Sequence, residues 1–260
     1  DATIQEICEK AMRECYDVNK AQAVHLIAMD PYTGAILAMC SKPDYDPNDP
    51  PRDQPDALTR LMRIRLISDA YEPGSTFKAL VLAAALEEGV VSESDTFYCP
   101  GYYMVEGWPK PISCSKKAPG HGTQTLKVAT GNSCNPAFVT MGLKIGTEAY
   151  YRYLKSFGLM ETTGIDLPAE AEGIFANEDS FNSNVVSLAA YSFGQTFNVT
   201  PLELIRRVRP DVLVKGSDYT VETVVGAELV REYGGRVHLA GLVDGCSTTH
   251  LVRRMGSDRS

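Results

Sequence analysis

The secondary-structure pattern of this chain changes near residue 204, and that change constrains its fold more than any other sequence feature. From there on the chain predicts, in order, a strand at 211–214, a helix at 222–233, a strand at 236–239 and a helix at 247–255. Alternating strands and helices with short Gly-bearing links are typical of a parallel α/β unit. The first 200 residues lack this alternation. We therefore predict two domains, 1–203 and 204–260.

The N-terminal domain is predicted to be α+β. Apolar residues recur at three- and four-residue steps from Ile4 to Cys15, which predicts a helix with one apolar face. Thr3 and Glu6 have the spacing of a capping box at the start of that helix. Two β-prone runs follow between residues 23 and 39, joined by a Pro- and Gly-bearing turn. Further helices are predicted at 57–70, after Lys78, from Pro136 and at 148–157.

The composition argues against some classes of protein. Of 260 residues, 25 are Lys or Arg and 33 are Asp or Glu, so the formal net charge is −8. An acidic surface repels phosphates, and no nucleic-acid partner is expected. No apolar run approaches the roughly 18 residues needed to span a bilayer. The sequence starts at Asp1 rather than at Met, which predicts a piece of a longer protein.

Seven cysteines and four histidines are spread along the chain. No two cysteines form a Cys-x-x-Cys pair and the histidines are dispersed, so no metal site is expected. Cys99 and Cys114 bracket a Gly/Pro-rich loop and could form a disulfide in an oxidising compartment. Free thiols are the alternative, because sequence separation does not show whether the two Cα atoms come within about 7 Å.

The clearest chemical signal is Ser75-Thr76-Phe77-Lys78. Ser and Lys three residues apart on a helix share one face, so the amine can reach the hydroxyl. A lysine that is partly desolvated has a lowered pKa and can remove the proton of the serine. The N–H groups of the helix N-terminus can then stabilise an oxyanion beside Ser75. The alternative is an N-capping serine followed by a solvated lysine.

A second motif, Ser133-Cys134-Asn135, lies 58 residues after Ser75. A hydroxyl and an amide two residues apart can line one wall of a cleft. Ser133 is a candidate proton relay between Lys78 and a leaving group, and Asn135 is a candidate contact for a substrate carbonyl or for the lysine. The alternative is a turn followed by an N-cap.

Together with other segments, these motifs give residues 3–203 a resemblance to the transpeptidase domain of class B penicillin-binding proteins. The chain is most similar to the sporulation-type clostridial and bacillar members. The matching segments are 29–39, 71–78, 97–101, 132–136, 163–168, 192–195 and 199–201. Ser-x-x-Lys and Ser-x-Asn belong to the motif set of penicillin-binding proteins and their β-lactamase relatives. The resemblance implies an α+β core of the penicillin-binding-protein/β-lactamase-like kind, in incomplete form.

The resemblance also implies roles for four residues. Ser75 is expected to be the nucleophile that is acylated by the D-Ala-D-Ala end of a peptidoglycan stem peptide or by a β-lactam. Lys78 is expected to act as the base, Ser133 as the proton relay and Asn135 as a substrate-binding residue. No cofactor is expected. The parent protein is expected to be membrane-anchored on the extracytoplasmic face of the bacterial cell membrane, with division or sporulation partners.

The third family motif, Lys-Thr-Gly or Lys-Ser-Gly on an edge strand, is absent from the sequence. Lys215-Gly216-Ser217 has the wrong order and lies only 20 residues after Gln195. In the family this strand pairs with the substrate backbone and supplies an oxyanion donor. Loss of one such donor typically lowers the rate by about 10²–10³, so we expect impaired catalysis.

The C-terminal region has a resemblance of its own. The segments 209–216, 225–228 and 246–249 are similar to the end of the cytidylyltransferase-like domain in bacterial enzymes that make ADP-heptose. In that family a Ser-Thr-Thr sequence, here 247–249, helps to hold nucleotide phosphates at a helix N-terminus. The H-x-G-H motif that performs the transfer is absent from the sequence. The chain is therefore interpreted as a chimera, joined near 202–207, that ends in a small Rossmann-like α/β fragment.

The sequence leaves two further functions open. The first is a non-catalytic domain that binds peptidoglycan or a partner protein, and the second is a nucleotidyltransferase fragment. Covalent labelling by a fluorescent penicillin distinguishes an acylating enzyme, which is labelled, from a non-catalytic binding domain, which is not. Stabilisation by a nucleotide would indicate the second.

Overall fold

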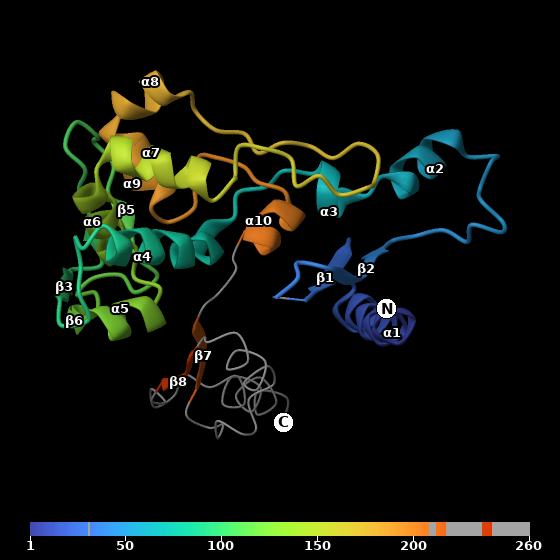
Figure 1. The fold of residues 1–260 in the computed structure, drawn as a ribbon, viewed down its shortest axis with the longest axis horizontal. Coiled ribbons are helices and arrows are strands. Elements are labelled where there is room, and N and C mark those ends of the chain that lie inside the picture. The colour runs from blue at the N-terminus through green and yellow to red at the C-terminus, as the bar shows by residue number, and fades with distance from the viewer. Residues whose placement is uncertain (31, 208–211, 217–235, 241–260) are drawn as a thin grey trace. The chain divides into compact units, whose positions relative to one another are not determined.

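The computed structural model describes residues 1–30, 32–207, 212–216 and 236–240. The chain divides into two compact units, residues 1–208 and 209–260. We call them the N-terminal and C-terminal units and describe each by itself (Figure 1). The N-terminal unit combines helices with short antiparallel strands, which confirms the predicted α+β class. No helix within the described ranges is long and apolar enough to cross a membrane.

The N-terminal unit begins with the predicted amphipathic helix, α1 (Ala2–Asn19). The Asp1 carboxylate caps this helix by accepting the Ile4 N–H at 3.0 Å. The predicted capping box of Thr3 and Glu6 is therefore wrong, because both residues lie inside the helix. Asp serves as an N-cap at least as well as Thr, and the helix starts two residues earlier than its apolar pattern indicates.

A β-hairpin follows α1, as predicted. β1 (Val24–Met29) and β2 (Ile36–Lys42) pair in antiparallel register. Asp30 closes the turn between them: its backbone N–H donates to Ala35 O at 2.9 Å, and its carboxylate accepts the Tyr32 N–H at 2.8 Å. An Asp that bonds the backbone two residues ahead is a common way to stabilise such a turn.

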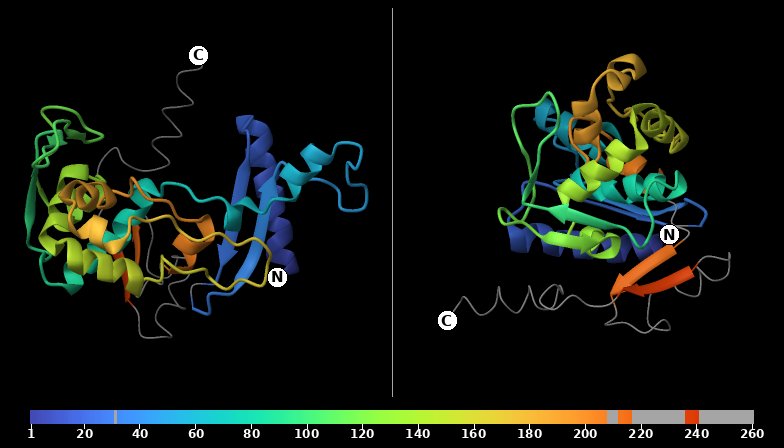
Figure 2. Two further views of the ribbon diagram at one scale, coloured as in Figure 1. Left: turned by 90° about the horizontal axis from the view of Figure 1, so that it is seen from above. Right: turned by 90° about the vertical axis from the view of Figure 1, so that its left-hand side faces the viewer.

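Helix α1 lies against the hairpin, and Figure 2 shows it running alongside the two strands. The Gln5 side chain connects the two elements, because its amide group both donates to and accepts from the backbone of Met39. Within the described ranges, β1 pairs only with β2. The second edge of β1 therefore has no strand partner in this part of the chain.

The rest of the N-terminal unit is mainly helical. Its helices are α2 (Pro55–Met62), α3 (Arg65–Ser68), the 3₁₀ turn η1 (Gly74–Phe77), α4 (Lys78–Glu87), α5 (Leu126–Gly131), α6 (Asn135–Ile145), α7 (Thr147–Ser156), α8 (Glu178–Asn182), α9 (Val185–Tyr191) and α10 (Pro201–Arg207). The helix predicted at 57–70 is instead two helices, because the backbone is extended at Arg63. The Arg63 side chain there bonds Ser68 and Asp69.

Helix α6 is the centre of this helical part, because it contacts α4, α7 and α9. The core beside it contains a group of aromatic side chains. Ring centroids lie 4.7 Å apart for Phe77 and Phe197, 4.6 Å for Phe197 and Tyr191, and 4.8 Å for Tyr191 and Phe181. Aromatic rings bury large apolar areas, so this group fixes the position of η1, which carries Phe77.

Two short antiparallel pairs lie between α4 and α5. β3 (Thr96–Cys99) pairs with β6 (Gly122–Thr125), and β4 (Tyr102–Tyr103) pairs with β5 (Ile112–Ser113). Gly120 allows the connecting backbone to approach closely, because a Cβ there would lie 2.2 Å from Cys99 O. The segment from 99 to 122 is thereby folded back on itself.

The backbone just before Ser75 is held by a distant segment. Tyr71 and Val199 exchange two backbone hydrogen bonds of 2.9 and 3.0 Å, and the Gly74 N–H donates to Gly194 O at 2.8 Å. Gly194 has φ +80°, and a Cβ on it would lie 2.0 Å from Gly74 O. A side chain at position 194 is therefore incompatible with this contact.

In the C-terminal unit, β7 (Val212–Gly216) pairs with β8 (Arg236–Ala240) in parallel register. This pair confirms the two strands and the parallel arrangement that the sequence predicts. The predicted helices at 222–233 and 247–255, and the Ser-Thr-Thr sequence at 247–249, lie outside the described residues.

We predict that Gly194→Ala destabilises the N-terminal unit by about 1–3 kcal/mol, because the new Cβ collides with the Gly74 backbone and the residue has a left-handed φ. Urea denaturation followed by circular dichroism measures this effect. Gly131→Ala is the matched control: it is helical with no atom within 4 Å of the new Cβ, so it should change stability by no more than about 1 kcal/mol. Equal effects of the two substitutions would contradict the prediction.

Candidate active site

Ser75 lies in the single 3₁₀ turn η1, directly before α4 begins at Lys78. The Thr76 hydroxyl stabilises this turn by donating to Pro73 O at 2.6 Å. Gly74 has φ +56°, a left-handed conformation that Gly adopts readily. The Ser75 side chain is exposed, whereas Lys78 is only 4% exposed. The turn therefore presents the hydroxyl to solvent and directs the amine into the protein.

The Lys78 ammonium is surrounded by acceptors from the Ser133–Asn135 turn. Nζ donates to Ser133 O at 2.7 Å, to Ser133 Oγ at 3.0 Å and to Asn135 Oδ1 at 2.6 Å. The Phe138 ring centroid lies 5.2 Å from Nζ and adds a cation–π contact. An ammonium has three N–H donors, and three acceptor atoms surround this one.

The backbone of the Ser133–Asn135 turn is shaped for this contact. Ser133 has φ +49°, an uncommon conformation for a residue other than Gly. Asn135 begins α6, with Pro136 in its first turn as predicted. The Asn135 amide also donates to Ser113 O at 2.8 Å. A left-handed serine held by tertiary contacts is typical of functional sites, where the surrounding structure maintains local strain.

Burial changes the acid–base behaviour of Lys78. Desolvation lowers the pKa of its ammonium to about 8, although the neighbouring Cys114 and Cys134 oppose this shift. Burial removes water from around the ammonium, and the hydrogen bonds replace that hydration only in part, so the charged form is disfavoured and the pKa falls. About a tenth of Lys78 is therefore a neutral amine at pH 7, and this is the state that accepts a proton.

The structure brings three of the four predicted site residues into contact: Lys78, Ser133 and Asn135. Ser75 lies one turn away, and within the described ranges its side chain has no hydrogen-bond partner. The predicted contact between Ser75 and Lys78 is thus not formed here, because the donors of Nζ point to the Ser133–Asn135 turn. Hydrogen bonds of catalytic groups often tighten only when substrate binds.

Four possible metal ligands lie next to this turn. The donor atoms of Cys99, Cys114, His121 and Cys134 are all within 4.8 Å of one another, and we call these residues the four-donor cluster. The sequence predicts no metal site, because the cysteines have no ligand-type spacing and the histidines are dispersed. The fold nevertheless collects these donors from four separate segments, which no local motif indicates.

The thiols of the cluster are free. Cys99 and Cys114, the pair considered for a disulfide, are both unbonded to other cysteines. Burial raises the pKa of the Cys134 thiol to about 12. Burial also acts to raise the pKa of Cys114, but the N–H groups of Lys116 and Asn135 donate to its sulfur and bring the pKa below its ordinary value. The thiols therefore differ in acidity although they are neighbours.

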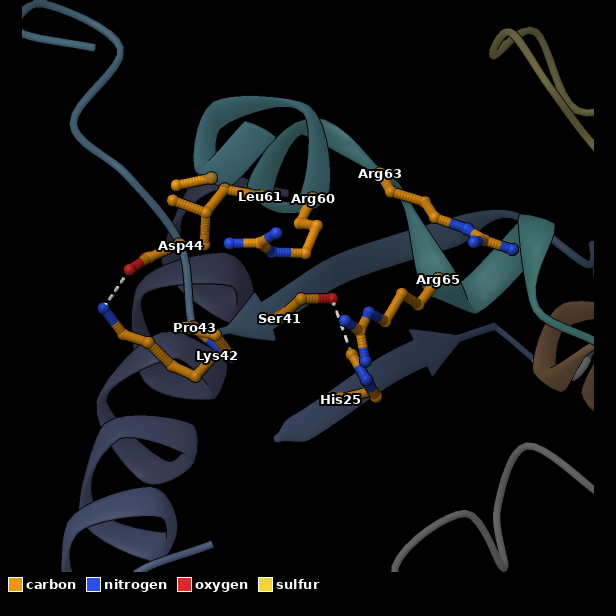
Figure 3. A pocket seen from close by; sticks show the side chains of 10 residues that line it. His25, Ser41, Lys42, Pro43, Asp44, Arg60, Leu61, Arg63 and Arg65 are labelled. Atoms are coloured by element: carbon orange, nitrogen blue, oxygen red, sulfur yellow. Dashed lines mark hydrogen bonds and ion pairs between the residues drawn. The ribbon is translucent and has the colours of Figure 1, made fainter. Parts of the chain in front are cut away.

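A pocket of about 220 Å³ lies elsewhere, between the hairpin and α2 (Figure 3). Basic side chains line it, including those of Lys42, Arg60 and Arg65, and the His25 ring contacts Ser41 Oγ at 2.9 Å. None of the four predicted site residues lines this pocket. The candidate site at η1 and α6 is therefore separate from this pocket.

The structure thus places an exposed serine one turn from a buried lysine that bonds a Ser-x-Asn turn. This combination is typical of one class of acyl-transfer site. The family model for the penicillin binding protein transpeptidase domain matches residues 24–215. The chain belongs to this family. Both the fold and the predicted resemblance are thereby confirmed.

Individual relatives agree with this assignment. The chain is 38% identical over 209 residues to stage V sporulation protein D of Bacillus subtilis, a match that covers 80% of this chain and 31% of that protein. It is 29% identical over 206 residues to the peptidoglycan D,D-transpeptidase FtsI of Escherichia coli, covering 79% and 33%. The chain thus spans about a third of the length of these relatives.

A solved structure has the same fold. Pseudomonas aeruginosa PBP2 in complex with WCK 5153 matches with a TM-score of 0.69 and 25% identity, covering 80% of this chain and 49% of that one. The chain also matches a protein of another kind. Over 58 residues it is 67% identical to the bifunctional protein HldE of Caulobacter vibrioides, which covers 22% of this chain and 12% of that protein. It confirms the predicted resemblance of the C-terminal fragment to an ADP-heptose synthase.

We predict that Asn135→Ala lowers the stability of the N-terminal unit by about 1–3 kcal/mol, because it removes an acceptor from the buried Lys78 ammonium and a donor from Ser113 O. Thermal denaturation provides the measurement. Asn48→Ala is the control, since Asn48 is exposed and its side chain bonds, among the described residues, only Asp46. A melting temperature of Asn135→Ala equal to that of the control would show that the contact does not stabilise the fold.

Proposed function

We propose that this chain carries a serine D,D-transpeptidase-type site that forms an acyl-enzyme on Ser75. The observation that carries the proposal is the Lys78 amine, which is buried, has a lowered pKa and contacts both Ser133 and Asn135 one turn from an exposed serine. The family membership and the names of the relatives support the same reaction class.

Acylation requires a proton acceptor for Ser75. In the neutral state Lys78 Nζ takes the Oγ proton while Oγ attacks the carbonyl carbon of the donor. The resulting tetrahedral oxyanion would be stabilised by backbone N–H groups of the 3₁₀ turn that carries Ser75. Collapse of this intermediate forms the ester on Oγ and expels an amine.

The expelled amine must gain a proton. Ser133 Oγ contacts Lys78 Nζ at 3.0 Å, so a proton can pass from the lysine through this hydroxyl to the leaving nitrogen. Asn135 uses its Oδ1 to hold the lysine and its Nδ2 to bond Ser113 O. We assign it a role in orienting the lysine and contacting a substrate carbonyl.

The proposed acyl donors are the D-Ala-D-Ala end of a peptidoglycan stem peptide and, in its place, a β-lactam. The proposed setting is cell-wall synthesis on the extracytoplasmic face of the bacterial membrane, with division or sporulation partners. The names of the relatives, which include a sporulation protein and peptidoglycan transpeptidases, support this setting. The two proposed domains are 1–203 for this site and 204–260 for the nucleotidyltransferase-like fragment.

The rate of this site is expected to be reduced. The sequence contains no Lys-Thr-Gly or Lys-Ser-Gly motif to supply the second oxyanion donor. Removal of one such donor lowers the rate by about 10²–10³ in other acyl-transfer enzymes. We therefore expect slow acylation rather than none.

We predict that a fluorescent penicillin labels the full chain covalently and slowly, and that Ser75→Ala abolishes the label because it removes the proposed nucleophilic hydroxyl. Gel fluorescence and the intact mass measure the adduct. Ser94→Ala, a change of an exposed serine in a loop, serves as the matched control and should label like the parent chain.

The same experiment distinguishes the alternatives. No adduct at saturating penicillin on a chain with a cooperative thermal transition would reject acylation and favour a non-catalytic binding domain. Stabilisation by CTP or ATP in the absence of any adduct would favour the nucleotidyltransferase fragment.

We predict that the labelling rate rises about tenfold between pH 7 and pH 9, because the reactive neutral amine of Lys78 becomes the major form above its pKa of about 8. The ammonium of Lys78 loses its proton as the pH rises through this pKa, so the fraction of neutral amine increases with pH and decreases as the pH falls. Initial labelling rates across this range, corrected for hydrolysis of free penicillin, give the profile. A rate independent of pH would exclude Lys78 as the titrating base.

A further inference from the structure

We propose that the four-donor cluster of Cys99, Cys114, His121 and Cys134 binds one Zn²⁺ ion. Ligands held at about 2.0–2.3 Å in a tetrahedron around zinc lie about 3.5–3.8 Å from one another. In this structure Cys114 Sγ lies 4.0 Å from Cys134 Sγ and 3.5 Å from His121 Nδ1, and all four donors lie within 4.8 Å. Small side-chain adjustments are therefore enough to form the coordination shell.

The donor types select zinc over the hard cations. Three thiolate sulfurs and one imidazole nitrogen form a soft set that is poor for Mg²⁺ or Ca²⁺, which require oxygen ligands. Zinc binds thiolates, so the thiols release their protons to solvent as the metal enters. With a neutral imidazole the bound site carries a net charge of −1.

The cluster is closed, as in structural zinc sites. Cys99 and Cys134 are fully buried, Cys114 is 4% exposed and His121 is half-buried. Four protein ligands fill a tetrahedral shell, which leaves no position for water or substrate. We therefore assign the metal a structural role and no step in the acylation.

Each donor comes from a different segment. Cys99 ends β3, Cys114 follows β5, His121 precedes β6, and Cys134 is the N-cap of α6. Buried free cysteines ordinarily pack as isolated small hydrophobic residues. Here three of them meet an imidazole where four segments cross, so one ion would hold all four together.

The metal would also fix the Ser133–Asn135 turn, because Cys134 is its central residue. The two residues that flank Cys134 supply all three acceptors of the Lys78 ammonium. Zinc binding itself does not depend on the proposed acylation, and its test uses the metal as the readout.

The experiment begins with the full chain, reduced, loaded with ZnSO₄ and dialysed against metal-free buffer. Inductively coupled plasma mass spectrometry should then find one zinc per chain. Substitution with Co²⁺ should produce sulfur-to-cobalt charge-transfer absorption and the visible bands of tetrahedral cobalt, because three thiolates coordinate the ion. Both measurements use the unmodified chain and so do not depend on how a variant folds.

Two variants locate the site. Cys114→Ser and His121→Ala should each lower zinc affinity by at least about a hundredfold in competition with a chromophoric chelator, since loss of outer-shell partners alone lowers it 10–100-fold. Cys15→Ser is the matched control, because Cys15 is exposed on α1 and should leave affinity unchanged.

The proposal is overturned if the reduced, folded chain retains no zinc, or if its cobalt form lacks the charge-transfer absorption. It is also overturned if Cys15→Ser weakens binding as much as Cys114→Ser does. A Cys99–Cys114 disulfide that persists in the isolated protein in excess zinc, shown by peptide mass spectrometry, would overturn it as well and would support the disulfide instead.

Discussion

The structure around the site depends on one buried charge. Lys78 enters the protein at the start of α4 and finds three acceptors within 3.0 Å, all from Ser133 and Asn135. A buried ammonium without acceptors is strongly unfavourable, so α4 and the start of α6 must meet in this register. The same desolvation that demands these contacts lowers the pKa of the amine. One interaction thus joins the two motifs and makes the lysine a usable base.

The position of Ser75 depends on a second constraint, the backbone contact between Gly74 and Gly194. Both glycines have a left-handed φ, and a Cβ on Gly194 would lie 2.0 Å from Gly74 O, so no side chain fits at position 194 without a shift. The Phe77 ring, two residues after Ser75, packs on Phe197. Ser75, the proposed nucleophile, therefore lies on a turn fixed from both sides, by backbone contact before it and by aromatic packing after it. This placement keeps an exposed hydroxyl on a rigid support.

Two of the matches are to different kinds of protein. The transpeptidase family model covers residues 24–215, and a 58-residue stretch is 67% identical to HldE of Caulobacter vibrioides. The parallel pairing of β7 with β8 agrees with the α/β rhythm that the sequence predicts after residue 204. We propose a chimera whose site chemistry resides in the N-terminal unit.

The sequence by itself determined the elements and the chemical identity of the site. Periodicity located α1, β1 and β2, and the two short motifs proposed Ser75, Lys78, Ser133 and Asn135 as the site, because local spacing and residue type carry that information. It did not predict the Asp1 cap, the break at Arg63 or the 3₁₀ turn, which depend on small local differences in hydrogen bonding. Only the tertiary structure directed Lys78 toward the Ser133–Asn135 turn and collected four metal-type donors from β3, β5, β6 and α6. Contacts between segments distant in sequence follow from how the core packs, and no local pattern encodes them.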